Sequence, residues 1–190
     1  MHLRKQCAPI ILVLLFSLAL LSSCAPRPVA EPFATGLSQP RGMAFDATGN
    51  LFVAEAGALA PGATSNISPQ INHSSRVVRI APDGHVTTVL DNLPYTNYVE
   101  AGDTGAADVA FIGNTLYALI GEGYDDQLSR MVLRVQPGAP PQPVANLRRF
   151  AEGTVPMAEQ MISAGPPSNP DAIVAAPDGS VLYVADGASG

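Results

Sequence analysis

Residues 41–57 read RGMAFDATGNLFVAEAG, and this stretch decides the expected fold. Two short apolar runs, 41–45 and 51–56, flank the polar segment DATGN. Apolar runs of about four to eight residues around an Asp-Gly or Gly-Asn turn signal are typical of the two strands of a β-hairpin. A similar phrase, DAIVAAPDGSVLYVADGASG, returns at 171–190. The stretch therefore predicts one hairpin of a repeating β-structure.

Strands in the same order recur along the chain. Met43, Val109 and Ile173 open equivalent apolar runs, at spacings of 66 and 64 residues. The expected strands are 41–45, 51–56, 76–81, 85–90, 107–112, 115–121, 130–136, 141–147, 171–176 and 181–186. Each unit is therefore expected to be a four-stranded antiparallel meander, and the third unit is incomplete.

This repeat predicts an all-β fold of the β-propeller type. A fixed period of four short strands is the signature of a propeller blade, whose sheet buries its faces against neighbouring blades. A β-sandwich also has short strands, but nothing in that fold requires the same phrase at a regular spacing. The predicted blades are about 37–94, 105–147 and 168–190. We expect about two and a half blades in an open arc, because repeat units that lack neighbours leave their faces uncovered.

The first residues have the pattern of a secretory signal. Arg4 and Lys5 precede the uninterrupted apolar run 10–21. This run is too short for a membrane-spanning helix, which needs about 20 residues. Residues 1–23 are therefore expected to be a signal peptide of an exported protein.

The end of this signal suggests a lipid anchor. The segment LSSC at 21–24 resembles the bacterial lipobox, which implies a diacylglyceryl group on Cys24. The alternative is an ordinary cleavage site that contains a cysteine. Residues 24–36 would form the lipidated, Pro-rich linker that holds residues 37–190 on the extracytoplasmic side of a membrane.

Charge and cysteine content exclude several classes of partner. The chain has a formal net charge of −6, and without residues 1–23 it has 8 basic residues, all Arg, against 16 acidic ones. Such an acidic chain is not expected to bind nucleic acid, whose affinity comes mostly from neutralised phosphates. Cys24 would be the only cysteine of the mature chain, so disulfides and cysteine-ligated metals are not expected.

Three acids offer the best candidate for chemistry. Glu55, Glu122 and Asp186 are each expected to end the second strand of a unit. Acids at equivalent blade positions could converge and bind Ca²⁺ through their oxygens. The structural alternative is that each carboxylate accepts backbone N–H groups and fixes a turn, and its recurrence in every unit favours this. The turn acids Asp46, Asp83 and Asp178 are interpreted as structural on the same ground.

The long connections are the other places where function is expected. Segment 57–75 is too long for a turn and contains His73, and EGYDDQ at 122–127 places three carboxylates beside Tyr124. Loops above about 12–15 residues are usually functional or disordered. Segment 155–163 has helical spacing and predicts a short covering helix. Because the chain has no tryptophan, any stacking site would use tyrosines: Tyr95, Tyr98 and Tyr124.

The order of these motifs resembles one known family. LSQPRGMAFDATGNLFVAEAG, SRVVRIAPDGHVTTVLDNLP, GAADVAFIGNTLYALIGEG and SNPDAIVAAPDGSVLYVADGASG follow the pattern of the ScyD/ScyE family. These exported bacterial proteins are related in style to NHL-repeat and SMP-30/gluconolactonase-like six-bladed propellers. The resemblance runs from about Phe33 to Gly190, although Ala172 stands where the family usually has Gly. It implies a six-bladed propeller of which this chain is an N-terminal fragment, and it brings no catalytic residues.

Three functions remain open at this stage. The first is a membrane-tethered binding or scaffold module that takes a protein or a small molecule. The second is a calcium-dependent hydrolase of the lactonase type, and the third, weaker because no histidine motif is present, is a quinoprotein dehydrogenase. The sequence has no G-x-S-x-G elbow, P-loop or dinucleotide fingerprint, so no catalytic residue is assigned. Fold alone does not separate these functions.

Overall fold

The computed structural model describes residues 29–63, 69–98, 102–123, 127–154 and 168–187, and of residues 151–154 the backbone only. The chain divides into two units, Met1–Phe33 and Ala34–Gly190. Described residues 29–33 of the first unit form neither helix nor strand, and they are exposed. All of the described helices and strands belong to the second unit.

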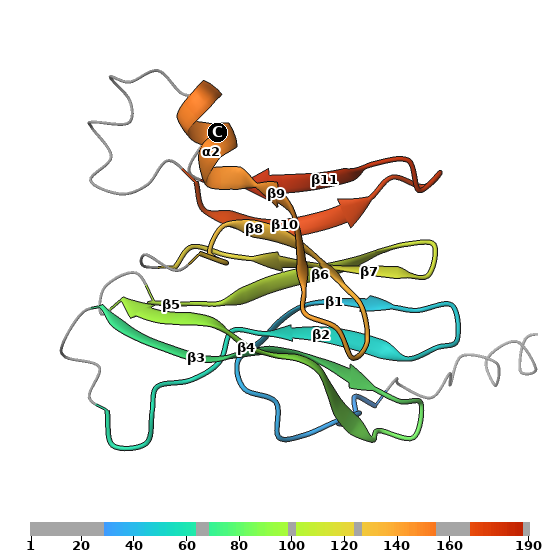
Figure 1. Cartoon of the computed structure of the whole chain (residues 1–190). Coiled ribbons are helices and arrows are strands. Elements are labelled where there is room, and N and C mark those ends of the chain that lie inside the picture. Colours follow the sequence, from blue (N-terminus) through green and yellow to red (C-terminus); the bar gives the residue numbers. More distant parts are fainter. Residues whose placement is uncertain (1–28, 64–68, 99–101, 124–126, 155–167, 188–190) are drawn as a thin grey trace, which may run out of the picture. The chain divides into compact units, whose positions relative to one another are not determined.

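In its described ranges the second unit is all-β apart from helix α2 (Leu147–Thr154), and their strand pairings are antiparallel (Figure 1). The first sheet has the strand order β1-β2-β3-β4-β5. Its strands are β1 (Pro40–Phe45), β2 (Leu51–Glu55), β3 (Gln70–Ile80), β4 (Val86–Tyr98) and β5 (Gly102–Thr104). The all-β class predicted from the repeat is confirmed.

Two further sheets repeat the beginning of the first. The second sheet runs β6-β7-β8-β9, and the third, as far as the structure describes it, is the pair β10-β11. Their strands are β6 (Ala106–Ile112), β7 (Thr115–Ile120), β8 (Met131–Val135), β9 (Gln142–Asn146), β10 (Pro170–Ala175) and β11 (Leu182–Asp186). The ten expected strands are confirmed, because short apolar runs bounded by Gly-containing turns act locally.

Three elements differ from expectation. β3 begins at Gln70, so it takes up part of the segment that was expected to be a loop, and it places the exposed His73 on a strand. β5 was not predicted. Helix α2 (Leu147–Thr154) was also missed, although Asn146 caps it by accepting a hydrogen bond from the Arg149 N–H at 2.9 Å. The helix predicted at 155–163 lies outside the described residues.

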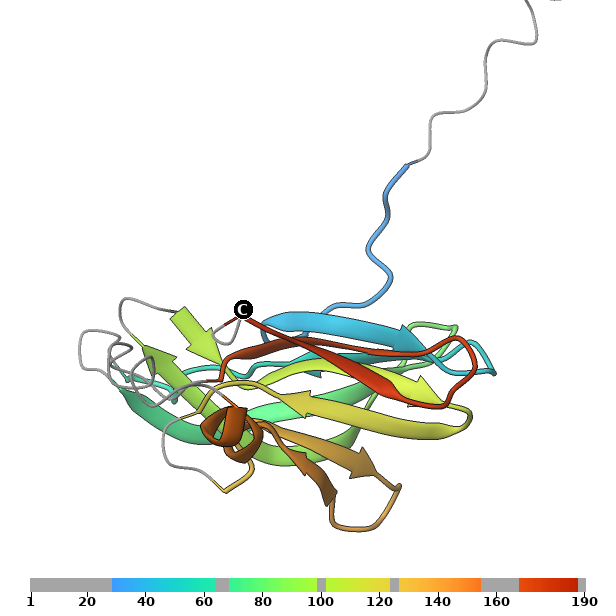
Figure 2. The ribbon, with the colours of Figure 1, turned by 90° about the horizontal axis from the view of Figure 1, so that it is seen from above.

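The three hairpins point the same way. Figures 1 and 2 show the β1–β2, β6–β7 and β10–β11 turns at one end of the sheets, which we call the hairpin end. The opposite end, where β2, β7 and β11 finish, is the loop end. Side chains of the repeat therefore meet at one of two places, and the candidate acids belong to the loop end.

Two cores lie between successive sheets, and a third packs Val53, Val78 and Ile80 of the first sheet against Ala34 and Leu37. The first strands are in contact in the order β1, β6, β10. One core packs Phe52, Ala54 and Val77 of the first sheet against residues of the second such as Val109. Another packs residues of the second sheet against Ile173. Burial of these apolar side chains, worth about 25 cal/mol per Å² removed from water, holds the sheets face to face.

Candidate functional site

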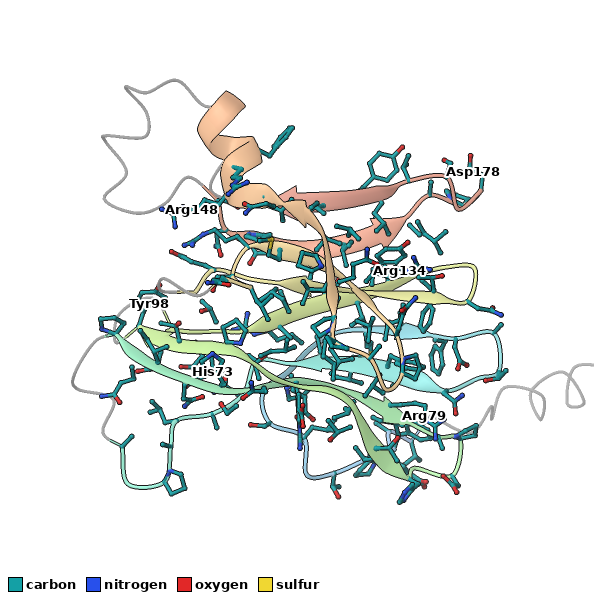
Figure 3. The ribbon with its side chains drawn as sticks, viewed as in Figure 1. His73, Arg79, Tyr98, Arg134, Arg148 and Asp178 are labelled. Atoms are coloured by element: carbon teal, nitrogen blue, oxygen red, sulfur yellow. The ribbon has the colours of Figure 1, made fainter. Side chains whose placement is uncertain are left out.

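The buried polar side chains of the described part of the chain gather at the loop end. They come from the end of β2, the middle of β3, the end of β4, and the residues just before β8 and β10. They are Glu55, Ser75, Thr96, Asn97, Ser129, Arg130 and Ser168. Figure 3 shows Tyr98 and Arg148 toward the same end. Because a buried polar group is costly unless it is hydrogen-bonded, the partners of each indicate its role.

Glu55 forms an ion pair inside the first sheet. Its carboxylate is fully buried, and Oε2 accepts a hydrogen bond from Nε of Arg76, the residue opposite it on β3. Oε1 has no hydrogen-bond partner among the described residues. The Ser75 hydroxyl donates to the Glu55 carbonyl oxygen at 2.9 Å and accepts from the Ala106 N–H at 2.7 Å. This corner therefore ties β2 and β3 to β6.

Glu122 lies two residues beyond the end of β7. The cross-strand register places Ile120, not Glu122, at the position of Glu55 and Asp186. The Glu122 carboxylate accepts a hydrogen bond from Nη2 of Arg130 at 2.9 Å. Glu122 is thus part of a different local arrangement from the other two acids.

Arg130 is the centre of that arrangement. It is 3% exposed and has a backbone φ of 56°, which is rare for a residue with a side chain. Nε donates to the Ser168 carbonyl at 2.8 Å and Nη1 to the Gly123 carbonyl at 3.2 Å. Burial lowers the pKa of Arg130, and the charge of Glu122 opposes this change. The guanidinium therefore joins the second sheet to the residues that begin the third.

Asp186 closes the third sheet. Its Oδ2 accepts a hydrogen bond from the Ser168 hydroxyl at 2.7 Å, and its Oδ1 accepts one from the Asn169 N–H at 2.7 Å. These partners are 17 and 18 residues earlier in the chain, so the carboxylate joins the end of β11 to the residues before β10 and does not fix a local turn. Within the described ranges, no three His, Cys, Asp or Glu side chains gather into a group that could hold a metal ion.

The hairpin acids have the structural roles expected of them. Asp46 accepts hydrogen bonds from the N–H groups of Thr48 and Asn50, both at 2.9 Å. Asp178 accepts from the N–H and hydroxyl of Ser180, and Asp83 from the His85 N–H. The hydrogen bonds from Asn50 lower the pKa of Asp46 to about 2. These carboxylates stabilise turns.

A second polar group at the loop end, the Asp103 cluster, was not predicted. Asp103 of β5 accepts hydrogen bonds from the side chains of Gln39, Tyr95 and Asn97, and Arg41 donates to its backbone carbonyl. Although burial raises it, these hydrogen bonds keep the pKa of Asp103 below its ordinary value. Burial and the bond to Asp103 raise the pKa of Tyr95 to about 12. The cluster joins β5 to the chain entering β1.

Several predicted features lie outside the described residues. These are Cys24, Tyr124 and the two aspartates that follow it, and the segment 155–163. In the described ranges, none of the helices has the length and apolar character needed to cross a membrane. Comparisons of the chain with family models, with curated proteins and with solved structures give no match.

Proposed function

We propose that this chain forms part of a β-propeller that serves as a binding or scaffold module, tethered to the extracytoplasmic face of a membrane through a lipid on Cys24. The observation that carries the proposal is the exposure of equivalent residues in the three sheets. In a propeller each sheet has a neighbour on both faces, so equivalent positions are buried in every blade.

The first strands provide the comparison. Met43, Val109 and Ile173 pair with the equivalent residues Val53, Ala118 and Val184 of the following strands. Val109, which faces the first sheet, is 2% exposed, and Ile173, which faces the second, is 5% exposed. Met43, on the outer face of the first sheet, is 58% exposed. On the same face Val53, the partner of Met43, is buried with Val78 and Ile80 against Ala34 and Leu37. The outer face is therefore apolar and partly covered, and it is exposed at Met43 and Phe45.

The outer face of the third sheet also exposes residues whose equivalents in the second sheet are buried. Ala110 faces the third sheet and is 5% exposed, whereas the equivalent Val174 is 61% exposed. Tyr183, opposite Val174 on β11, is also exposed. Exposed apolar patches on sheet faces usually mark interaction surfaces. Further sheets on both sides would bury these residues as the present ones bury Val109 and Ala110.

The reactivity of introduced cysteines tests whether the outer faces of the first and third sheets are covered by further sheets, as in the closed ring of a propeller. In the protein on its own membrane, Met43→Cys and Val174→Cys are expected to react with a maleimide reagent at least about tenfold more slowly than Thr48→Cys, because protected thiols react only after local opening. Thr48 lies in an exposed turn and serves as the control. Equal rates at the three positions would refute the ring.

The lipid anchor has its own test. Cys24→Ser is expected to abolish incorporation of a labelled fatty acid and to release the protein from the membrane fraction. Ser22→Ala, two residues earlier, should keep both properties. A Cys24→Ser protein that is still labelled and membrane-bound would disprove the anchor.

The calcium-dependent hydrolase is the alternative function. It is favoured by one observation, the buried Glu55 Oε1 that lacks a described partner. The three acids have protein partners, because Glu55 pairs with Arg76, Glu122 pairs with Arg130, and Asp186 accepts hydrogen bonds from Ser168 and Asn169; this favours the binding module. We therefore expect Ca²⁺ to leave the melting temperature unchanged. A Ca²⁺-dependent rise that Glu55→Gln or Glu122→Gln removes, and Asp83→Asn retains, would establish the metal site instead.

A further inference from the structure

A pocket of about 280 Å³ lies at the hairpin end between the first and second sheets. Both sheets contribute to it, through the β1–β2 turn, β2 and β4 on one side and β6, β7 and β8 on the other. Its apolar lining residues are Phe52, Val89, Phe111, Leu116, Val135 and Pro137. The pocket is therefore built by the packing of two sheets, and it is far along the strands from the polar groups of the loop end.

The apolar wall of the pocket contains a pair of aromatic rings. The rings of Phe52 and Phe111 meet edge to face, with centroids 5.1 Å apart and an interplanar angle of 79°. Leu116 and Val135 are both buried. An apolar cavity of about 150 Å³ already accepts benzene, and ligand pockets commonly begin at about 300 Å³. The volume fits a compact molecule of one or two rings.

The mouth carries a negative charge. Thr48 and Asn114 are exposed lining residues, and Asp46 stands beside them. Asp46 Oδ1 accepts hydrogen bonds from Thr48 and Asn50, whereas Oδ2 accepts one from the Asn50 side chain at 2.8 Å. Its low pKa keeps the carboxylate ionised at neutral pH. Arg79, which pairs with Phe52 across β2 and β3, is not among the lining residues.

We propose that this pocket binds a small aromatic amine, with its ring against Phe52 and Phe111 and its ammonium group at the Asp46 carboxylate. The aromatic wall provides apolar contact and aromatic partners for the ligand ring. An anion of the same size would meet the Asp46 charge and be rejected. The inference rests on the proposed binding function and names its ligand class, but it does not depend on ring closure.

Three probes of similar size test the charge preference. Tryptamine, indole and indole-3-propionate share one ring system and differ in the charge of the side chain. In titrations of the full chain followed by NMR, tryptamine is expected to bind at least about tenfold more tightly than indole-3-propionate, a difference of about 1.4 kcal/mol. Perturbed signals should include those of Phe52 and Phe111. Equal affinity for the amine and the acid, or no binding of tryptamine, would overturn the proposal.

Two variants, each with a matched control, locate the site. Asp46→Asn should reduce tryptamine affinity about tenfold and leave indole binding unchanged, since it removes the charge and keeps the shape. Asp178→Asn, which changes the corresponding hairpin turn of the third sheet, is the matched control and should bind as the wild type does.

Val89→Trp should fill the pocket and block every probe, whereas Val174→Trp on the outer face of the third sheet should not. An equal effect of Asp46→Asn and Asp178→Asn would contradict the site. The maleimide reactivities of Met43→Cys and Val174→Cys separate this failure from a failure of the ring.

Discussion

The Asp108 carboxylate of β6 accepts a hydrogen bond from the Ile173 N–H of β10, with a distance of 2.9 Å between Oδ2 and N. Its Oδ1 accepts a second one, from the N–H of Val109, at 2.8 Å. On the other side, Gly42 of β1 lies so close that a Cβ there would be 1.8 Å from Oδ1. One side chain therefore contacts the first strands of all three sheets. It sits where β6 departs from regular pairing, since the register shifts between Ala106 and Asp108.

Asp108→Asn is expected to lower the free energy of unfolding by about 1–3 kcal/mol. The amide keeps one acceptor oxygen and places an NH₂ group against a backbone N–H, and a buried donor without a partner costs about this much. Urea denaturation measures the change. Asp171→Asn, at an exposed residue of β10, should change stability by less than about 0.5 kcal/mol. Equal effects of the two substitutions would show that the bridge between β6 and β10 contributes nothing.

Gly42→Ala should destabilise the protein by about 2 kcal/mol or more, because a new Cβ would overlap the Asp108 carboxylate. The matched control is Gly121→Ala, whose Cβ would lie 3.2 Å from the Gly105 carbonyl, a distance that a small shift relieves. Thermal denaturation of both variants makes the comparison. A Gly42→Ala protein as stable as Gly121→Ala would mean that β1 and β6 are less closely packed than described.

Arg130→Gln is expected to lower the free energy of unfolding by about 3 kcal/mol, because Arg130 is buried and its ion pair with Glu122 is partly buried. Two backbone carbonyls, those of Gly123 and Ser168, would lose their donor as well. Arg149→Gln in α2 provides a control of the same chemistry at an exposed side chain. Denaturation followed by circular dichroism measures the free energy of unfolding of both variants. If the two values differ by less than about 1 kcal/mol, the role of Arg130 is contradicted.

The raised pKa of Tyr95 predicts that the folded protein loses stability at alkaline pH. Its folded pKa is raised to about 12, so its contribution to stability is complete below the ordinary value near 10 and is lost as the pH rises through 12. Tyr95→Phe should remove this part of the decline between pH 10 and 12. Absorbance of tyrosinate together with unfolding curves at each pH measures it. Tyr183→Phe, at an exposed tyrosine, should keep the wild-type profile.

The expected elements were found where the pattern is local. Leu51–Glu55 and Leu182–Asp186 are short apolar runs that follow Gly-containing turns. Elements that depend on a partner were missed. Gly102–Thr104 is polar and short, and it is a strand because it pairs with the end of β4. The cap at Asn146 was the one local signal of α2 that could have been used.

Among the candidate acids too, the roles that depend on neighbours in the sequence were predictable, and those that depend on distant residues were not. Asp46, Asp83 and Asp178 bind residues two to four positions later in the chain, so their turn roles were predictable. Glu55 and Glu122 look alike in the sequence, yet the strand register separates them by two positions. The Asp103 cluster was not predictable, because Gln39 and Asp103 are 64 residues apart.

The sequence by itself determined the all-β class, the hairpins and their turns, because a two-residue side-chain period and Gly or Asp at a turn act over a few residues. The tertiary structure alone decided which polar groups meet. The contact of Asp108 with Ile173, the buried Arg130 and the pocket beside Phe52 and Phe111 all require two sheets to pack face to face. Such packing joins residues distant in the chain, and no local pattern records the partner.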